Sequence, residues 1–239
     1  MTNDVVKLVL LTLSAGLAMP LGASLAAVER IRSRWLETEV RHAVIAFGGG
    51  ALLAAVALVL VPEGVHGLSP LAVVVSFASG SLLFMFLDMW LAANNTQLSQ
   101  LVAMLSDFVP EALALGAAFA LSEEAGVLMA GIIALQNIPE GFNAYREIRV
   151  STDYRGLHII GAFILMAFLG PIAGLAGYFF LTELAGVVSC IMLFAAGGIL
   201  YIIFQDIAPQ ARLQNHWVPP LGASVGFLLG VLGKILTGA

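Results

Sequence analysis

The sequence predicts an all-α integral membrane protein with eight transmembrane helices in a single domain, residues 1–239. Of its residues, 60% are hydrophobic and only 10% are charged, whereas a soluble domain normally carries about a quarter charged residues. Apolar segments long enough to cross a bilayer recur along the chain with short gaps. Basic residues gather in every second gap. Together these observations favour a multi-pass membrane domain.

The expected helices leave only short loops between them. The first apolar run is about 20 residues long, so we expect a retained helix rather than a cleaved signal peptide. In chain order the expected spans are about 6–28, 43–62, 70–93, 99–121, 125–145, 157–181, 186–206 and 219–237.

Positive charge divides the expected loops into two sides. Eight of the ten basic residues lie in odd-numbered loops, and the other two lie near the termini. Because short loops rich in Lys and Arg stay in the cytoplasm, the odd-numbered loops are expected inside and both termini outside. The residues of the odd-numbered loops are Arg30, Arg32, Arg34, Arg41, Arg146, Arg149, Arg155 and Arg212, and the remaining two are Lys7 and Lys234.

Composition also limits the classes of partner that we expect. The net charge of −5 and the lack of long basic runs argue against nucleic acid. The single cysteine, Cys190, excludes a disulfide within the chain. No G-x-x-x-x-G-K-[ST] loop for ATP is present. The lipid bilayer is therefore the expected environment, and any transport would depend on gradients or on a partner protein.

Two pairs of predicted helices have similar sequence patterns. The second helix carries Phe47 followed by three glycines and ends at Pro62, while the seventh carries Phe194 followed by Ala-Ala-Gly and ends near Pro209. The fourth and fifth helices each carry a central Pro-Glu pair. In the expected topology the members of each pair run in opposite directions, so the fold is expected to contain inverted repeats in a 3+2+3 arrangement. Opposed repeats around a midplane site are typical of transporters.

Acidic side chains at membrane depth are the candidate functional residues, because each costs roughly 2.5–3.5 kcal/mol to insert. Asp107 and Glu111 are four residues apart on the fourth helix, and Gln136 and Glu140 have the same spacing on the fifth. That spacing places both members on one helix face. Neither helix core contains Lys or Arg, so a bound cation, protons or both are expected to neutralise the carboxylates.

Further oxygen atoms are candidates for accessory ligands. Prolines before both glutamates would free backbone carbonyls near Ser106 and Leu135. Asp88 and Asp206 are further carboxylates near predicted helix ends, where capping or pairing with an arginine explains them equally well. Glu63 lies at the predicted outer boundary of the membrane, where solvation by water is enough to explain a charged side chain.

These motifs resemble those of the ZIP family of divalent metal transporters. Gln136 to Gly141 is similar to the family's His-Asn-x-Pro-Glu-Gly signature on the fifth helix, and Asp107 to Ala112 sits where the fourth helix carries a related motif. The resemblance implies eight helices with both termini outside and inward movement of zinc, iron, manganese, cobalt or cadmium. It also implies an elevator-like motion, in which the first, fourth, fifth and sixth helices slide against the others. No cofactor beyond the transported ion and no enzymatic activity are expected.

The resemblance implies a metal site whose ligands are Asp107, Glu111, Gln136 and Glu140. A second site, common in the family, would add positions that here hold Phe108, Asn137 and Gly170.

Phenylalanine and glycine supply no ligand atom at that second site, so we expect one ion in the pathway, with Asn137 as an accessory residue. The ligands that remain are all oxygen atoms. Because oxygen sites suit manganese better than they suit zinc, selectivity is expected to be shifted away from a strict zinc preference.

Two other functions remain open. The chain is alternatively a transporter-like protein that binds or senses metal, or moves another cation, without the family's flux. A remote alternative is an intramembrane metal-dependent enzyme, although the H-E-x-x-H and G-x-S-x-G motifs are absent. The expected location is the cell membrane, which is the inner membrane in a Gram-negative bacterium. The small-residue face of 222–233 would pack either within one protomer or in a homodimer.

Overall fold

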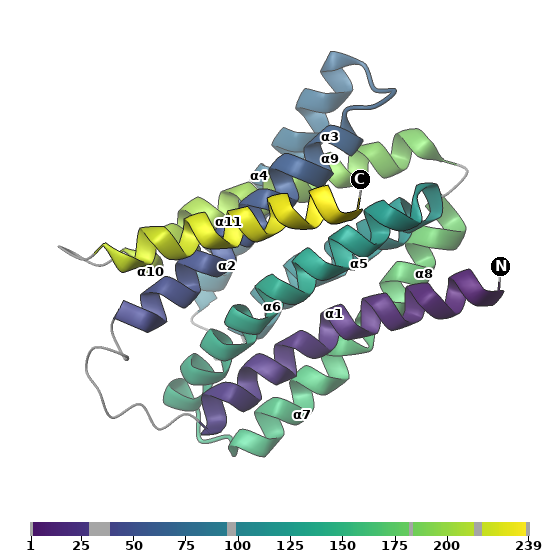
Figure 1. Cartoon of the computed structure of the whole chain (residues 1–239). Helices are drawn as coiled ribbons and strands as arrows, with labels where there is room; N and C mark the ends of the chain where they lie inside the picture. The colour runs from purple at the N-terminus through teal and green to yellow at the C-terminus, as the bar shows by residue number, and fades with distance from the viewer. Residues whose placement is uncertain (1, 29–38, 95–98, 182–183, 213–216, 238–239) are drawn as a thin grey trace.

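The computed structural model describes residues 2–28, 39–94, 99–181, 184–212 and 217–237, which form a bundle of long helices (Figure 1). Within these ranges there is no strand, so the predicted all-α class is confirmed. The elements are α1 (Thr2–Val28), α2 (Arg41–Ala55), η2 (Val56–Leu60), α3 (Val61–Gly64), α4 (Pro70–Asn94), α5 (Ser99–Leu121), α6 (Glu123–Ser151), α7 (Gly156–Ala167), α8 (Leu169–Leu181), α9 (Ala185–Ile202), η3 (Ile203–Ile207), α10 (Ala208–Ala211) and α11 (Val218–Thr237).

Seven helical segments in the described ranges are long and apolar enough to cross a membrane, and α5 contributes a shorter apolar stretch, Phe108–Leu121. The chain is thus built as a multi-pass membrane protein. Most element ends lie within a few residues of the predicted spans, but α6 continues to Ser151. The predicted sixth span divides into α7 and α8 at Phe168. Pro171 explains this break, because it has no N–H to donate to the carbonyl of Ala167.

The helices pack as two groups. The α5–α6 group comprises α1, α5, α6, α7 and α8, and the α2–α9 group comprises α2, η2, α3, α4, α9, η3, α10 and α11. The four most extensive helix contacts lie inside these groups, namely α1 with α6, α5 with α8, α2 with α11, and α4 with α9. The main contact between the groups joins α2 to α6. Each group is therefore more tightly packed within itself than against the other.

Glycines make the contacts within a group unusually close. A Cβ added to Gly141 of α6 would collide with the carbonyl oxygen of Met19 in α1. Similar backbone collisions would occur in the other three extensive pairs, at Gly116 against Gly174, Gly226 against Phe47, and Gly80 against Phe194. Glycines at the junction of the two groups instead meet side chains. Gly48 of α2 faces the ring of Pro139, and Gly233 of α11 faces Leu128 of α6. Backbones interlock within each group, whereas these contacts between groups are made by side chains.

We expect Gly141→Ala to destabilise the protein by about 1–3 kcal/mol, because the added methyl group must push α1 away from α6. Gly131→Ala on the same helix is the matched control, since a Cβ there meets nothing within 4 Å. It should leave stability unchanged or raise it slightly, because alanine favours helix more than glycine does. Thermal unfolding in one detergent compares the two variants, and equal midpoints would contradict the close packing of α1 on α6.

The second and seventh predicted helices, which have similar sequence patterns, also have similar structures. Each consists of an α-helix, a five-residue π-helical segment and a four-residue α-helix. In both, the π-helical segment starts six residues before the proline, which is Pro62 in one and Pro209 in the other. The two run in opposite directions (Figure 1): Gly49 in α2 lies against Ile207 at the end of η3, whereas Gly64 at the end of α3 lies against Leu193 in the first half of α9. The equal spacing therefore reflects a shared local structure.

A lysine from the far end of the chain contacts the first of these π-helical segments. The Nζ of Lys234 in α11 donates a hydrogen bond of 2.7 Å to the carbonyl oxygen of Leu58. Pro62, four residues later, has no N–H to offer that carbonyl.

The glycine-rich face of α11 packs on α2 within the same chain, through Gly222 on Ala43 as well as through Gly226. This face is thus used inside the protomer.

Candidate metal site

The candidate site is centred on α5 and α6, which pack against each other. Glu111 is 2% exposed and Gln136 is fully buried. The Nε2 of Gln136 donates to both carboxylate oxygens of Glu111, at 2.6 Å and 2.7 Å. The structure thus brings together two of the predicted ligands. It differs from the prediction in one respect: Gln136 presents its N–H group to the carboxylate, whereas we expected its oxygen to serve as a ligand.

The other end of the Gln136 amide lacks a partner. Its Oε1 atom is buried and accepts no hydrogen bond from any described residue. An unsatisfied buried acceptor costs about 1–3 kcal/mol, so a donor or a cation at this position would be stabilising. Half a turn about the Cγ–Cδ bond of Gln136 would exchange the two ends of the amide and present Oε1 to Glu111.

Glu140 completes the described part of the site. It lies one helical turn after Gln136, directly follows Pro139, and is partly buried. Its carboxylate is close enough to Glu111 for the two negative charges to repel each other. None of the described basic side chains interacts with either glutamate. Two carboxylates in this setting need a cation or protons to be stable.

The remaining predicted ligand is Asp107, whose side chain, like that of Ser106, lies outside the described part of the structure. Both residues belong to α5, and Asp107 precedes Glu111 by four residues. Among the side chains that are described, no three from His, Cys, Asp and Glu are grouped as a metal site. The described portion therefore supplies two carboxylates and one amide.

Two of the positions that would serve the second site of the ZIP family, Phe108 and Gly170, pack against each other. Phe108 is 1% exposed, and its ring lies between Gly16 of α1 and Gly170 of α8. A Cβ on Gly170 would approach Cζ of Phe108 to 2.8 Å and the carbonyl oxygen of Thr12 to 2.7 Å. Phe108 and Gly170 are therefore complementary in size: the ring needs the space that the glycine leaves.

Asn137, expected as an accessory ligand, connects two helices instead. It is 1% exposed, and its Nδ2 donates a hydrogen bond of 2.8 Å to the carbonyl oxygen of Ala15 in α1. The bond joins residues 122 positions apart, which no short motif reveals. Asn137 thus helps to hold α6 against α1.

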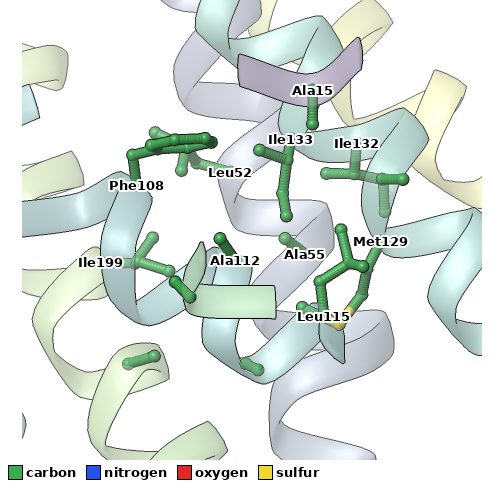
Figure 2. Close-up of a cluster of buried hydrophobic side chains, with 14 of the residues drawn as sticks. Ala15, Leu52, Ala55, Phe108, Ala112, Leu115, Met129, Ile132, Ile133 and Ile199 are labelled. Atoms are coloured by element: carbon green, nitrogen blue, oxygen red, sulfur yellow. The ribbon is translucent and has the colours of Figure 1, made fainter. Parts of the chain in front are cut away.

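An apolar cluster adjoins the site where α2, α5 and α6 meet. Figure 2 shows Leu52 from α2, Leu115 from α5, and Met129 and Ile133 from α6 in this cluster. All four side chains are at most 2% exposed. Leu115 lies one turn beyond Glu111 toward the α5–α6 loop, and Ile133 lies one turn before Gln136, and so two turns before Glu140, on the same side. The site is therefore covered by hydrocarbon toward that loop.

The other accessory candidates lie apart from the two glutamates. The hydroxyl of Tyr201 donates to Oδ2 of Asp88 at 3.1 Å. Asp206, in η3, is partly buried and interacts electrostatically with Asp88 and with Glu147. Glu63 is exposed on α3. The structure thus places Asp88 and Asp206 close enough for their negative charges to repel each other, whereas neither of them interacts with Glu111 or Glu140.

No protein-family model and no curated protein matches the chain.

Proposed function

We propose that the chain is a ZIP-type transporter that moves a divalent metal cation toward the cytoplasm. The observation that carries this proposal is the pair of glutamates that follow Pro110 and Pro139 on two packed helices. They repel each other inside an apolar bundle and have no described basic partner. A divalent cation bound between the two carboxylates would offset this repulsion. Carboxylates at membrane depth mark ion pathways in many membrane proteins.

The proposed ligands are the oxygen atoms of Glu111, Glu140, Asp107 and, after rotation of its amide, Gln136. Rotation would replace the N–H group that now faces Glu111 with the unpartnered Oε1. The burial of Phe108 supports a single ion, because its ring fills the space beside Gly170, where the resemblance to the ZIP family would place the ligands of a second site. The cargo class is zinc, iron, manganese, cobalt or cadmium.

The packing of the helices supports an elevator-type motion. The first, fourth, fifth and sixth predicted helices are α1, α5, α6 and α7 with α8, which together make up the α5–α6 group. Backbone contacts at glycines such as Gly141 hold this group together, while its junction with α2 includes the side-chain contact of Pro139 with Gly48. Side-chain contacts can be exchanged as the surfaces slide, whereas interlocked backbones cannot. The group that holds both glutamates is thus suited to move as one body.

The apolar side chains between the site and the α5–α6 loop support a conformation in which the site is closed to the outside of the cell. By the distribution of positive charge, the α5–α6 loop lies outside, and the buried side chains of Leu115 and Ile133 lie one turn from Glu111 and Gln136 on that side. Glu140, which lies closer to the cytoplasmic end of α6, keeps part of its surface exposed. In the proposed cycle the ion leaves past Glu140 toward the cytoplasm, and movement of the α5–α6 group reopens the outer route.

Competitive uptake into liposomes tests the proposal. Purified protein is reconstituted, and zinc flux is measured with manganese or cadmium added outside. Because the ligands are all oxygen, we expect manganese to compete within about tenfold of zinc, which corresponds to roughly 1.4 kcal/mol. A zinc-only profile would contradict the proposed selectivity but keep transport, whereas no flux of any of these ions would contradict transport itself.

A further inference from the structure

A long groove runs along the surface of the α2–α9 group, between α2, η3 with α10, and α11. Its volume is about 990 Å³, at the upper end of the range for ligand sites. Small residues such as Gly49, Gly50 and Ala223 line part of the groove, beside larger apolar side chains such as Phe204 and Leu228. We call it the α2–α11 groove.

The groove opens on the outer surface of the bundle. Phe204 is 67% exposed and Leu228 is 52% exposed, although both line the groove. In a bilayer this surface faces hydrocarbon. The lining residues of α11 run from Pro219 to Val231, a distance of about 18 Å along a helix. One leaflet of a bilayer has a hydrocarbon thickness of about 15 Å, so the groove is about as long as an extended acyl chain.

A single positive charge stands at one end of the groove. Among the described residues that line the groove, Arg212 is the only charged one. Its side chain is exposed, and it has no ion-pair partner among the described residues. Arg212 lies just after α10 in a loop that the charge distribution places in the cytoplasm. The cytoplasmic leaflet is the one that carries anionic lipids, which attract basic residues near its surface.

We propose that the α2–α11 groove binds one anionic phospholipid of the cytoplasmic leaflet. An acyl chain lies along the apolar lining from Pro219 to Val231, and the headgroup phosphate pairs with Arg212. The lipid fills the space between three elements of one group and supports their packing. This site is separate from Glu111 and Glu140 and does not depend on the nature of the transported ion.

Native mass spectrometry tests the proposal on detergent-purified, delipidated protein titrated with phosphatidylglycerol or phosphatidylcholine of identical chains. We expect one phosphatidylglycerol per chain. Arg212→Gln should weaken phosphatidylglycerol binding about fivefold and phosphatidylcholine binding by less, because choline already offsets the charge of its phosphate. Arg155→Gln is the matched charge control, because Arg155 is exposed on the same expected side and does not line the groove.

A second variant tests the groove itself. Ala208 is exposed and lines it, so Ala208→Trp should remove binding of both lipids, while Ala78→Trp on the exposed face of α4 should not. Equal phosphatidylglycerol affinity in Arg212→Gln and Arg155→Gln would overturn the proposal, as would full binding in Ala208→Trp. A lipid-free dimer that Ala208→Trp dissociates would identify a second copy as the occupant instead. If Ala208→Trp does not fold, the comparison of the two arginine variants decides alone. Glu111→Gln should keep its lipid whatever its metal flux.

Discussion

Glu111→Gln and Glu140→Gln should each reduce divalent-cation uptake into liposomes by at least about 100-fold. Both substitutions keep the size of the side chain and remove a negative charge that the ion needs. Removing one partner of a buried charge pair costs about 3–5 kcal/mol, and each 1.4 kcal/mol is tenfold in affinity. The loss is expected at both positions because both carboxylates are proposed to bind the same ion.

The control for this result is Asp153→Asn, which removes a carboxylate from an exposed residue between α6 and α7. It should transport like the unaltered protein. Membrane insertion and thermal unfolding are measured for all three variants. These measurements show whether a variant that loses flux has also lost its folded structure. Full uptake by the double variant Glu111→Gln, Glu140→Gln would refute the assignment of the site.

Phe108→Ala should lower the free energy of unfolding by about 3–5 kcal/mol, because a fully buried ring is removed. The space between Gly16 and Gly170 is shaped by backbone and by this ring, so neighbouring side chains have little freedom to fill it. Thermal unfolding in detergent or denaturant titration in mixed micelles measures the change.

Phe86→Ala is the matched comparison, since Phe86 on α4 is 59% exposed. Its loss should change stability by no more than about 0.5 kcal/mol. If the two variants unfold at the same midpoint, the ring of Phe108 does not have the structural role assigned to it. In that case the reason for expecting a single ion would also weaken.

Much of the fold could be predicted from the sequence because a bilayer constrains helices strongly. A spanning helix needs about 20 apolar residues, so the run from 70 to 93 could hardly be anything but the helix observed as α4. The equal Phe-to-Pro spacing likewise indicated two similar segments, and both have the same π-helical interruption. What sequence could not show there was the interruption itself, which depends on how the freed carbonyls find partners such as Lys234.

For the candidate site, the sequence could predict which side chains share a helix face but not which atoms they contact. A spacing of four residues places Gln136 and Glu140 on one face, but an amide has both a donor and an acceptor, and spacing does not decide which end points at Glu111. The sequence also showed that Phe108 has no ligand atom. It did not show that the ring packs against Gly170, because that contact joins α5 to α8. The hydrogen bond of Asn137 to Ala15 escaped prediction for the same reason.

One pair of measurements on a single preparation tests the central claim, that one divalent ion binds between α5 and α6 and crosses the membrane. Equilibrium dialysis against cadmium in detergent counts bound ions, and the same protein in liposomes reports flux. We expect one cadmium per chain and saturable flux, both lost in the double variant Glu111→Gln, Glu140→Gln. A bound ion without flux would mean that the chain binds or senses metal rather than transporting it. Flux or binding that survives in the double variant would contradict the claim.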